Sequence, residues 1–287
     1  MEKNLLKEIE AKRIFLSKGQ KLIANYVTAH YDKAAYLTAS KLGAVVGVSE
    51  STVVRFATEL GFDGYPAFQH ALQEMVRTKL TSFQRVEVTN DRIGNGDILS
   101  KVLLSDMEKI RHTLDGINRD DFNSAVQSIV CARKIYIIGA RSSATIAGFL
   151  GHNLRMIFDN VKLIDTVSGS ELFEEIMGIS DEDVMVAISF PRYSKKVINA
   201  VDYARNAGAD VIAVTDSKSS PIASNATQVL AAESDMASFV DSLVAPLSII
   251  NAIIVAVARE KKDELDVRLR RLEEIWDEYD VYDKSHG

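Results

Sequence analysis

The strongest constraint on this chain is an alternation of short apolar runs with helical segments through its second half. Five runs rich in β-branched residues lie at residues 134–139, 161–165, 183–189, 210–215 and 228–231. They are apolar at successive positions, as strands buried on both faces are, rather than at alternate positions. Apolar residues at helical spacing fill most of the intervals. This pattern predicts an open, doubly wound α/β domain with a parallel sheet covered on both sides.

Polar loops follow several of these runs, where such domains bind ligands at a reversal of strand order. Backbone N–H groups at a helix N-terminus, with hydroxyls and cations nearby, suit a phosphate. The candidate ligand-binding residues of these loops are Gly139, Arg141, Ser142, Ser143, Ser168, Ser189, Arg192, Tyr193, Ser194 and Lys195. Capping of the next helix is the alternative for any one serine-rich loop. Two such loops, each with an arginine, favour an anion site.

The first 80 residues have a different character, that of several short helices. Residues 38–61 have the pattern of a helix-turn-helix, in which two helices are joined by a tight turn. Leu42 and Val46 can face inward from the first helix, and small Gly43 suits the crossing of the helices. Gly47 can supply a positive φ in the turn. Apolar positions then close the core from the other side: Val48, Val53 and Phe56. An ordinary helical hairpin is the alternative.

The start of the second helix enters the DNA major groove in this motif. Ser49 suits the N-cap of that helix. The candidate DNA-binding residues are Lys41, Ser49, Glu50, Ser51, Thr52, Val54 and Arg55. For Arg55, a phosphate contact, a base contact and a solvated side chain all stay open.

The formal net charge of −6 argues by itself against a nucleic-acid partner. Residues 1–80, however, contain 11 Lys and Arg against 8 Asp and Glu, a net of +3, and the remainder carries −9. Phosphate contact needs local cations rather than a cationic whole protein. The basic excess, which includes Lys18 and Lys21 as further candidates, lies where the DNA-binding motif lies.

Residues 49–56 (SESTVVRF), followed by residues 60–65 (LGFDGY) and Phe68, resemble the N-terminal signature of RpiR-type (MurR/RpiR) bacterial transcription regulators. The resemblance implies a helix-turn-helix domain joined to a C-terminal SIS (sugar isomerase) domain, a doubly wound, flavodoxin-like fold that binds phosphosugars. It covers nearly the whole chain, because the order of the two predicted domains agrees.

The resemblance also implies roles for loop residues. The positions that match the SIS pattern are Gly139, Ser143, Ser189 and Ser194. Arg141 stands where the family usually has a second glycine, and residues 191–193 replace the more usual Ser/Thr-Gly segment. These departures remove flexible backbone and add two guanidinium groups that can grip an anion bidentately. They favour an anionic ligand such as a sugar-acid phosphate over a standard hexose phosphate.

The expected order is an all-α helix-turn-helix domain over residues 1–80, a linker and connecting helix over 81–114, the SIS domain over 115–261, and a C-terminal helix and tail over 262–287. A helix from about residue 121 to residue 131 should begin the SIS domain, with Asp120 or Asp121 as its cap.

The expected function is DNA-binding regulation of carbohydrate metabolism genes, with repression as the starting assumption, controlled by a phosphosugar or sugar-acid phosphate. A sugar-phosphate isomerase and a phosphosugar-binding protein without a DNA role are the alternatives. Isomerisation needs a base, usually a carboxylate or a histidine. None of the 5 histidines lies in the strand-end loops. Glu233, after the fifth run, is the remaining carboxylate, with binding of a ligand hydroxyl as its other role. We therefore expect no catalytic residues.

The single cysteine, Cys131, excludes an internal disulfide and a cysteine-based zinc site. We expect its thiol to be buried, and we expect no metal or cofactor. Residues 1–18 lack the apolar stretch of a signal peptide, and the apolar segment 240–258 contains Asp241 and Pro246. These features predict a cytoplasmic protein without a membrane span.

Helix-turn-helix proteins usually bind two half-sites as dimers, so we expect a homodimer or tetramer on double-stranded operator DNA. Two apolar stripes could supply the dimer surface. The first is Val240, Leu243, Val244, Leu247, Ile250, Ile254 and Val257, and packing on the sheet within one subunit is its alternative. The second is Leu265, Leu269, Leu272, Ile275 and Trp276 of the terminal helix.

Overall fold

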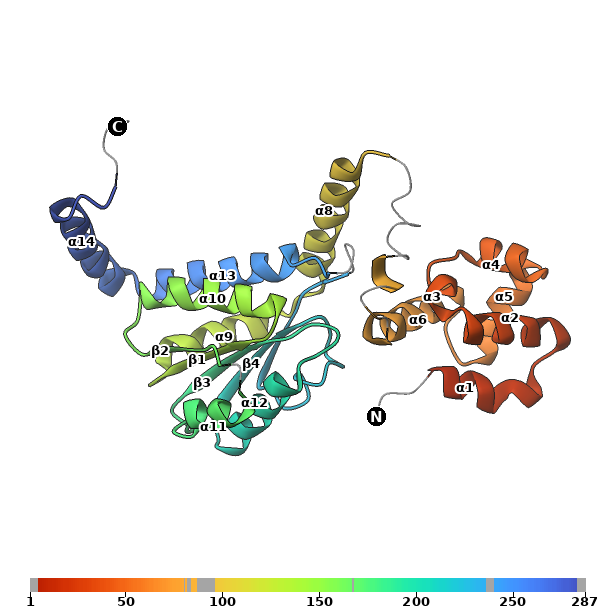
Figure 1. The fold of residues 1–287 in the computed structure, drawn as a ribbon, viewed down its shortest axis with the longest axis horizontal. Helices are drawn as coiled ribbons and strands as arrows, with labels where there is room; N and C mark the ends of the chain where they lie inside the picture. Colours follow the sequence, from red (N-terminus) through yellow and green to blue (C-terminus); the bar gives the residue numbers. More distant parts are fainter. Residues whose placement is uncertain are drawn as a thin grey trace. The chain divides into compact units, whose positions relative to one another are not determined.

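The computed structural model describes residues 5–79, 81, 84–86, 96–166, 168–235 and 240–282. The chain divides into two compact units, one of Met1–Ile98 with Asp235–Asp241 and one of Leu99–Ser234 with Ser242–Gly287. The first unit is helical and the second is built on a parallel sheet (Figure 1). Most of the linker predicted from residue 81 to residue 97 lies outside the described residues.

The helical unit consists of α1 (Leu5–Lys12), a 3-10 turn (Arg13–Phe15), α2 (Lys18–Ala29), α3 (Tyr31–Ala34), α4 (Ala39–Val46), α5 (Glu50–Glu59) and α6 (Tyr65–Lys79). Each longer helix turns an apolar face inward, and together they enclose one core. Phe68 lies at its centre, with its ring edge-on to the rings of Phe56 and Phe62 at 5.6 Å between centroids. The core holds α4 and α5 in place against α2 and α6.

One ion pair in this unit joins segments far apart in the sequence. Arg85, which is 2% exposed, donates from Nη1 to Oδ1 of Asp241 at 2.8 Å. Both residues belong to the helical unit, although Asp241 follows the last strand of the sheet. A guanidinium so deeply buried needs a counter-charge, because an uncompensated charge in the interior is strongly unfavourable.

The sheet unit contains α8 (Ile98–Gly116), α9 (Arg119–Cys131), β1 (Ile135–Gly139), α10 (Ser142–Arg155), β2 (Val161–Ile164), α11 (Gly169–Ile176), β3 (Val184–Ile188), α12 (Lys195–Asn206), β4 (Asp210–Thr215), β5 (Gln228–Ala231), α13 (Val244–Glu260) and α14 (Lys262–Glu278). The five strands pair in the order β2-β1-β3-β4-β5, and every pair is parallel. The predicted doubly wound fold is confirmed, with each strand within one residue of its expected bounds.

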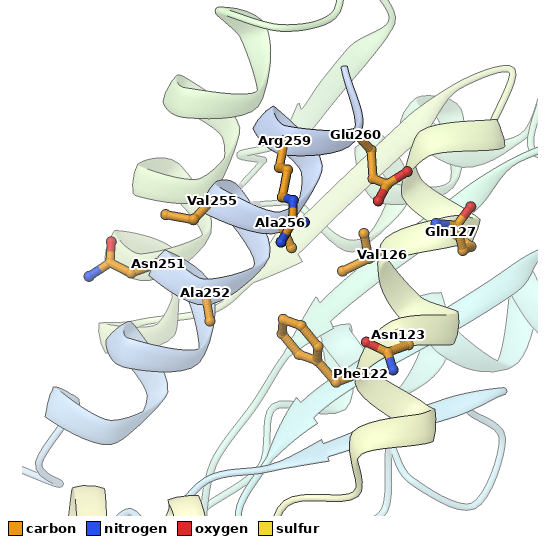
Figure 2. Close-up of a pocket in the computed structure, with 10 residues that line it drawn as sticks. All are labelled: Phe122, Asn123, Val126, Gln127, Asn251, Ala252, Val255, Ala256, Arg259 and Glu260. Carbon is orange, nitrogen blue, oxygen red and sulfur yellow. The ribbon is translucent and has the colours of Figure 1, made fainter. Parts of the chain in front are cut away.

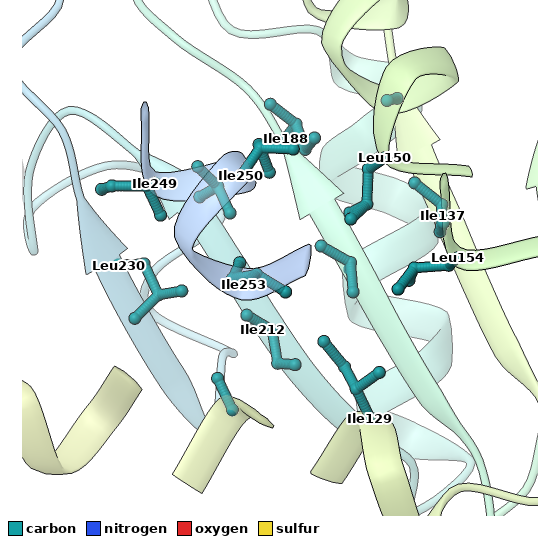
Figure 3. Packing of buried hydrophobic residues seen from close by; sticks show 14 of the residues in the cluster. Ile129, Ile137, Leu150, Leu154, Ile188, Ile212, Leu230, Ile249, Ile250 and Ile253 are labelled. Carbon is teal, nitrogen blue, oxygen red and sulfur yellow. The ribbon is translucent and has the colours of Figure 1, made fainter. Parts of the chain in front are cut away.

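The sheet is covered on both faces, as the continuous apolar runs predict. Ile137 of β1 packs with α9, α10 and α13 on one face (Figure 3). Its neighbour Ile138 points to the other face and packs with α11 and α12. Successive residues of a strand point to opposite faces, so a strand between two helical layers must be apolar at every position.

Two expectations differ from the structure. Asn118, not Asp120 or Asp121, caps α9, because the helix begins two residues earlier than expected and the Asn118 Oδ1 accepts from both aspartate amides. Cys131 is exposed rather than buried, because it is the last residue of α9 and lies off the helix face that packs on the sheet.

The first apolar stripe was open between a dimer surface and packing on the sheet within one subunit. Its helix, α13, begins at Val244, and Ile250 and Val257 are fully buried in the core on the sheet. Leu243, Leu247 and Ile254 pack against the same core. Most of this stripe therefore packs within the chain. None of the helices among the described residues is long and apolar enough to cross a membrane.

Candidate functional site

The turn between α4 and α5 has the geometry that the helix-turn-helix pattern predicts. Gly47 ends α4 with a φ of +78°, a conformation that side chains rarely adopt. A Cβ on Gly43 would lie 2.8 Å from the carbonyl oxygen of Val48, so only glycine lets the two helices approach this closely. Ser49 begins α5 by accepting a hydrogen bond from the Thr52 amide at 3.3 Å.

The outward face at the start of α5 carries most of the predicted DNA-binding residues. Ser49, Glu50, Ser51, Val54 and Arg55 are exposed there, and Lys41 is exposed in the first turn of α4. The Arg55 guanidinium folds back along the helix, where Nη2 lies 3.4 Å from the Ser51 Oγ and Nε donates to the Ser51 carbonyl at 3.3 Å. Hydroxyls and one cation therefore share the face.

Thr52 differs from the other members of this set. It is half-buried, its hydroxyl lies 2.9 Å from the Ser49 hydroxyl, and its methyl group faces Gly19 of α2. These contacts direct the side chain into the unit.

The sheet brings the two predicted anion loops together. The chain crosses from β1 to β2 on one side and returns to β3 on the other, so strand order reverses between β1 and β3. In this strand order the reversal is the position at which doubly wound domains bind ligands. Gly139 at the end of β1 pairs in register with Ile188 at the end of β3. The loops that begin after these two residues therefore start on neighbouring strands.

The first loop, from Gly139 to Ser143, is tightly closed. A Cβ on Gly139 would lie 2.5 Å from the Ser143 carbonyl oxygen, so glycine is required for the loop to return this closely to its strand. The Ser143 amide donates to the Ala140 carbonyl at 3.2 Å, and the Ser143 side chain is buried. Arg141, in contrast, is exposed at the bend with a φ of +57° and a ψ of −125°. This backbone conformation is strained for any residue except glycine.

The second loop is built in the same way after β3. Phe190 and Pro191 are buried, and they anchor the loop to the sheet. Arg192 follows, exposed, with a φ of +67°. The Tyr193 hydroxyl donates to the Asp216 Oδ1 at 2.8 Å. Two neighbouring loops thus each hold an exposed arginine in a backbone conformation that arginine rarely adopts.

The helices that follow β1, β2 and β3 begin without side-chain caps. Arg141, Ser168 and Ser194 occupy the N-cap positions of α10, α11 and α12, and none of the three makes a capping hydrogen bond within the described structure. A helix start without a cap leaves backbone N–H groups with a partial positive charge. Together with the arginines, these groups suit an anion.

The remaining candidates lie in the segments that follow β2, β3 and β5. Ser168 follows β2 beside β1, and Lys195 is the exposed first residue of α12. Glu233 follows β5, which is two strands from β3, and its amide donates to the Thr113 hydroxyl at 2.8 Å. Neighbouring strands are about 4.8 Å apart, so the end of β5 is about 10 Å from the end of β3. Glu233 therefore follows a strand that is two positions away from the strand before the second loop.

Sequence reasoning did not include Asp216 or Lys196 among the site residues. Asp216 accepts from Tyr193, and the Lys196 ammonium donates to the Thr166 carbonyl in the loop after β2. These contacts tie the second loop to the ends of β4 and β2. An acidic residue directly after an apolar run was the available signal for Asp216.

The amino-terminal ends of the strands, opposite the loops, carry an ion pair with a structural role. Arg133 lies 2.6 Å from the buried carboxylate of Asp183, which also accepts from the Ser180 amide at 2.8 Å. The carboxylate of Asp183 raises the pKa of Arg133 above its ordinary value by hydrogen bonding and charge. This pair lies at the starts of β1 and β3, away from the loops.

A cavity of about 710 Å³ lies between α9 and α13, in the helical layer over the sheet (Figure 2). Its lining residues are Phe122, Asn123, Val126, Gln127, Asn251, Ala252, Val255, Ala256, Arg259 and Glu260. None of the predicted ligand-binding residues is among them. The cavity is therefore separate from the loops at the strand ends.

Comparison with known families identifies both units. Residues 3–79 match the helix-turn-helix domain of the rpiR family, and residues 128–256 match the SIS domain. The chain belongs to the RpiR family. The resemblance inferred from residues 49–68 is confirmed, and so is the combination of the two domains. This RpiR-family chain is a transcriptional regulator of that type.

Relatives and solved structures agree with this assignment. The transcriptional regulator HexR of Escherichia coli is 26% identical over 282 residues, which cover 94% of this chain and 93% of HexR. The sugar isomerase domain of an RpiR transcription factor from Sphaerobacter thermophilus is 27% identical, with a TM-score of 0.58, over 61% of this chain and 97% of that one. Vibrio vulnificus NanR, solved in complex with ManNAc-6P, has the same fold, with a TM-score of 0.58 and 22% identity over 95% of this chain and 98% of NanR.

Proposed function

We propose that this RpiR-type regulator represses genes of carbohydrate metabolism and is controlled by a phosphosugar or sugar-acid phosphate bound at the ends of β1 and β3. The observation that carries the proposal is the pair of neighbouring loops at the reversal of strand order. Each combines an exposed arginine with a helix start that no side chain caps. Such a site offers amides, hydroxyls and guanidinium groups to one anion.

The DNA-binding part of the proposal rests on the exposed start of α5. Arg55, with Ser49 and Ser51 beside it, would enter the major groove, and Lys41 would contact the phosphate backbone. The net charge of +3 on residues 1–80 favours approach to DNA despite the negative charge of the whole chain.

Ligand binding at the sheet would change the affinity for the operator by linkage. Such coupling free energies are typically about 1–3 kcal/mol. The Arg85–Asp241 ion pair is our candidate for part of the route, because Asp241 lies in the segment that follows β5 and Arg85 in the segment that follows α6.

NanR, solved with a phosphorylated amino sugar, supports the choice of ligand class through its shared fold. The added arginines of this chain, Arg141 and Arg192, favour a ligand with a second negative group beside the phosphate. A carboxylate on the sugar would fill that role, because guanidinium and carboxylate groups form paired hydrogen bonds.

The test uses the 287-residue chain and DNA from upstream of its own gene. Fluorescence anisotropy at two salt concentrations should show tighter binding to this DNA than to random DNA, and binding should weaken steeply with salt. A panel of sugar phosphates and sugar-acid phosphates is then titrated into the complex. Release of the DNA by one of them supports repression, and tighter binding would indicate an activator.

Calorimetry with the same panel tests the ligand site. Arg192→Ala should weaken binding of the active compound, and undiminished binding would remove Arg192 from the site. Absent or salt-insensitive DNA binding would leave a phosphosugar-binding protein without a DNA role. A coupled isomerase assay should show no turnover, whereas turnover of about 1 per second or more would indicate an enzyme.

A further inference from the structure

The terminal helix α14 carries an apolar stripe that the rest of the described chain covers only in part. Its residues are half-buried, and the Trp276 ring lies edge-on to the Tyr282 ring at 5.4 Å between centroids. The stripe advances in steps of four, three and four residues: Leu265, Leu269, Leu272 and Trp276. No residue of α14 is buried, and within this stripe only Leu265 packs against the core of the sheet unit. Alternating steps of four and three are the a/d repeat of a two-stranded coiled coil.

The repeat fixes which charged residues flank the stripe. With Leu269 at position a and Leu272 at position d, Arg268 occupies position g, and Asp266 and Glu273 occupy position e. In a parallel pair, each g residue faces the e residue five positions later on the other helix. Arg268 of each helix would then meet Glu273 of the other, twice by symmetry.

An antiparallel pair would place e residues opposite each other. With Leu269 facing Leu272 of the second helix, Asp266 would meet Glu273 twice, and like charges repel. The charge pattern is therefore complementary to a second copy of itself only in the parallel orientation. Arg268 also contacts Asp159 at 2.7 Å, but that carboxylate is 89% exposed, and so open a pair holds the guanidinium weakly.

We propose that α14 pairs in parallel with α14 of a second copy of this chain, through Leu265, Leu269, Leu272 and Trp276. The helix spans only about two heptads, so the pair adds to a larger subunit contact rather than forming alone. The inference does not rest on the ligand or on the DNA sequence that the protein binds.

Cysteine crosslinking in the full chain tests the orientation. The background variant is Cys131→Ser, because Cys131 is exposed. In the parallel pair, residue 276 of one helix faces residue 276 of the other. Their Cα atoms would lie within the separation of about 4.4–6.8 Å that a disulfide needs. In the antiparallel pair the two copies of residue 276 are about 16 Å apart along the axis, eleven residues at a rise of about 1.5 Å each. Trp276→Cys should therefore give a reducible dimer in most of the protein.

The matched control is Val267→Cys, which is 71% exposed on the opposite side of the helix and should stay uncrosslinked. A mixture of Leu265→Cys and Trp276→Cys chains that crosslinks, when Trp276→Cys alone does not, would show an antiparallel pair and overturn the proposal. A crosslink at neither position would also overturn it. Circular dichroism of each variant checks that the helix is retained.

A charge exchange provides the second test, with Leu272→Cys as the reporter at position d. Arg268→Glu and Glu273→Arg should each lower the yield of crosslinked dimer several-fold. The double variant should restore it, because the pair is rebuilt with exchanged charges. The double variant also lacks the ion pair between residue 268 and Asp159. A recovered crosslinking yield would therefore come from the rebuilt pair with the second helix, not from Asp159. No recovery would contradict the proposed pairing.

Discussion

Serine and threonine residues at N-cap positions behave differently in the two units. In the helical unit, Ser17, Thr38 and Ser49 each accept a hydrogen bond from an amide in the first turn of the helix that follows. In the sheet unit, Ser168 and Ser194 stand at the same position before α11 and α12 without making that bond. Asn118, at the opposite edge of the sheet, does cap α9.

The difference teaches that an N-cap serine can serve two purposes. Where a helix must be held at a fixed angle, as α5 is, the hydroxyl satisfies the helix's own amides and stabilises it. At the ends of β1 to β3, the uncapped amides are the groups that would donate to the anion that we propose. Four predictions, each with a control variant, test the two units further.

The largest effect is expected from Gly139→Ala in the first loop. The added Cβ would lie 2.5 Å from the Ser143 carbonyl oxygen, so the backbone must shift. We expect the sheet unit to lose about 3 kcal/mol of its free energy of unfolding, measured by calorimetry, together with anion binding. In Gly148→Ala, within α10, a Cβ meets no atom within 4 Å, so stability should stay equal or rise by up to about 1 kcal/mol. Similar losses in both variants would show that the loop is not closely packed.

The next largest effect is expected at the two strained arginines, where substitution should raise stability and weaken ligand binding. Arg141→Gly and Arg192→Gly should each stabilise the ligand-free protein by about 1 kcal/mol, because glycine adopts a positive φ without strain. Each should also weaken sugar phosphate binding about tenfold or more, since a charge-assisted hydrogen bond is lost.

Asp280→Gly is the control for this prediction. Asp280 has a φ of +53° beyond the end of α14, so the variant should gain stability with unchanged binding. Thermal unfolding with and without the compound measures both effects. Full binding by Arg141→Gly would exclude that side chain from the ligand site.

A smaller effect compares the two kinds of serine directly. Ser49→Ala should destabilise the helical unit by about 1 kcal/mol, since it removes the cap of α5. Ser194→Ala should leave the ligand-free sheet unit nearly unchanged and should reduce its stabilisation by a sugar phosphate. Hydrogen exchange of the first-turn amides of α5 and α12 reports each effect locally. If both variants lost the same stability in the absence of ligand, Ser49 and Ser194 would have the same capping role, which would contradict the prediction.

The smallest effect concerns a group that keeps α6 in place in the helical unit. The Tyr65 hydroxyl donates to the Leu37 carbonyl at 2.6 Å, and burial raises its pKa to about 12 from 10.0. The unfolded chain therefore loses this proton first, and the associated stability, full below pH 10, is lost as pH rises from 10 to 12. Tyr65→Phe should flatten that decline in unfolding midpoint, whereas Tyr282→Phe, at a tyrosine 58% exposed, should not.

The sequence predicted the elements of the sheet unit closely. The expected runs at 210–215 and 228–231 coincide with β4 and β5, and the rest differ by one residue at their ends. A parallel strand buried on both faces shows a continuous apolar run whatever its neighbours are, so this signal is local. The signal for the turn of the helix-turn-helix was equally local. Gly43, Gly47 and Ser49 each meet a steric or hydrogen-bonding need of the backbone close to them in the sequence.

Features that depend on contacts between distant residues could not be predicted from local sequence patterns. Cys131 was expected to be buried, and the helix face to which it belongs was settled only by packing on the sheet. From the sequence, the first apolar stripe could either form a dimer surface or pack on the sheet. In the structure, most of its residues pack in the core over β3 and β4. Asp216 gained its partner Tyr193 only when β4 came to lie beside β3.

The sequence by itself determined which segments are strands, where α5 starts, and that two arginine-bearing loops follow strands. Only the tertiary structure decided that these loops are neighbours, because strand order is a property of the whole sheet. It also placed β5, which precedes Glu233, two strands from β3, and it put both arginines at a positive φ. Local spacing specifies the elements, and the packing of distant elements decides which side chains can meet one ligand.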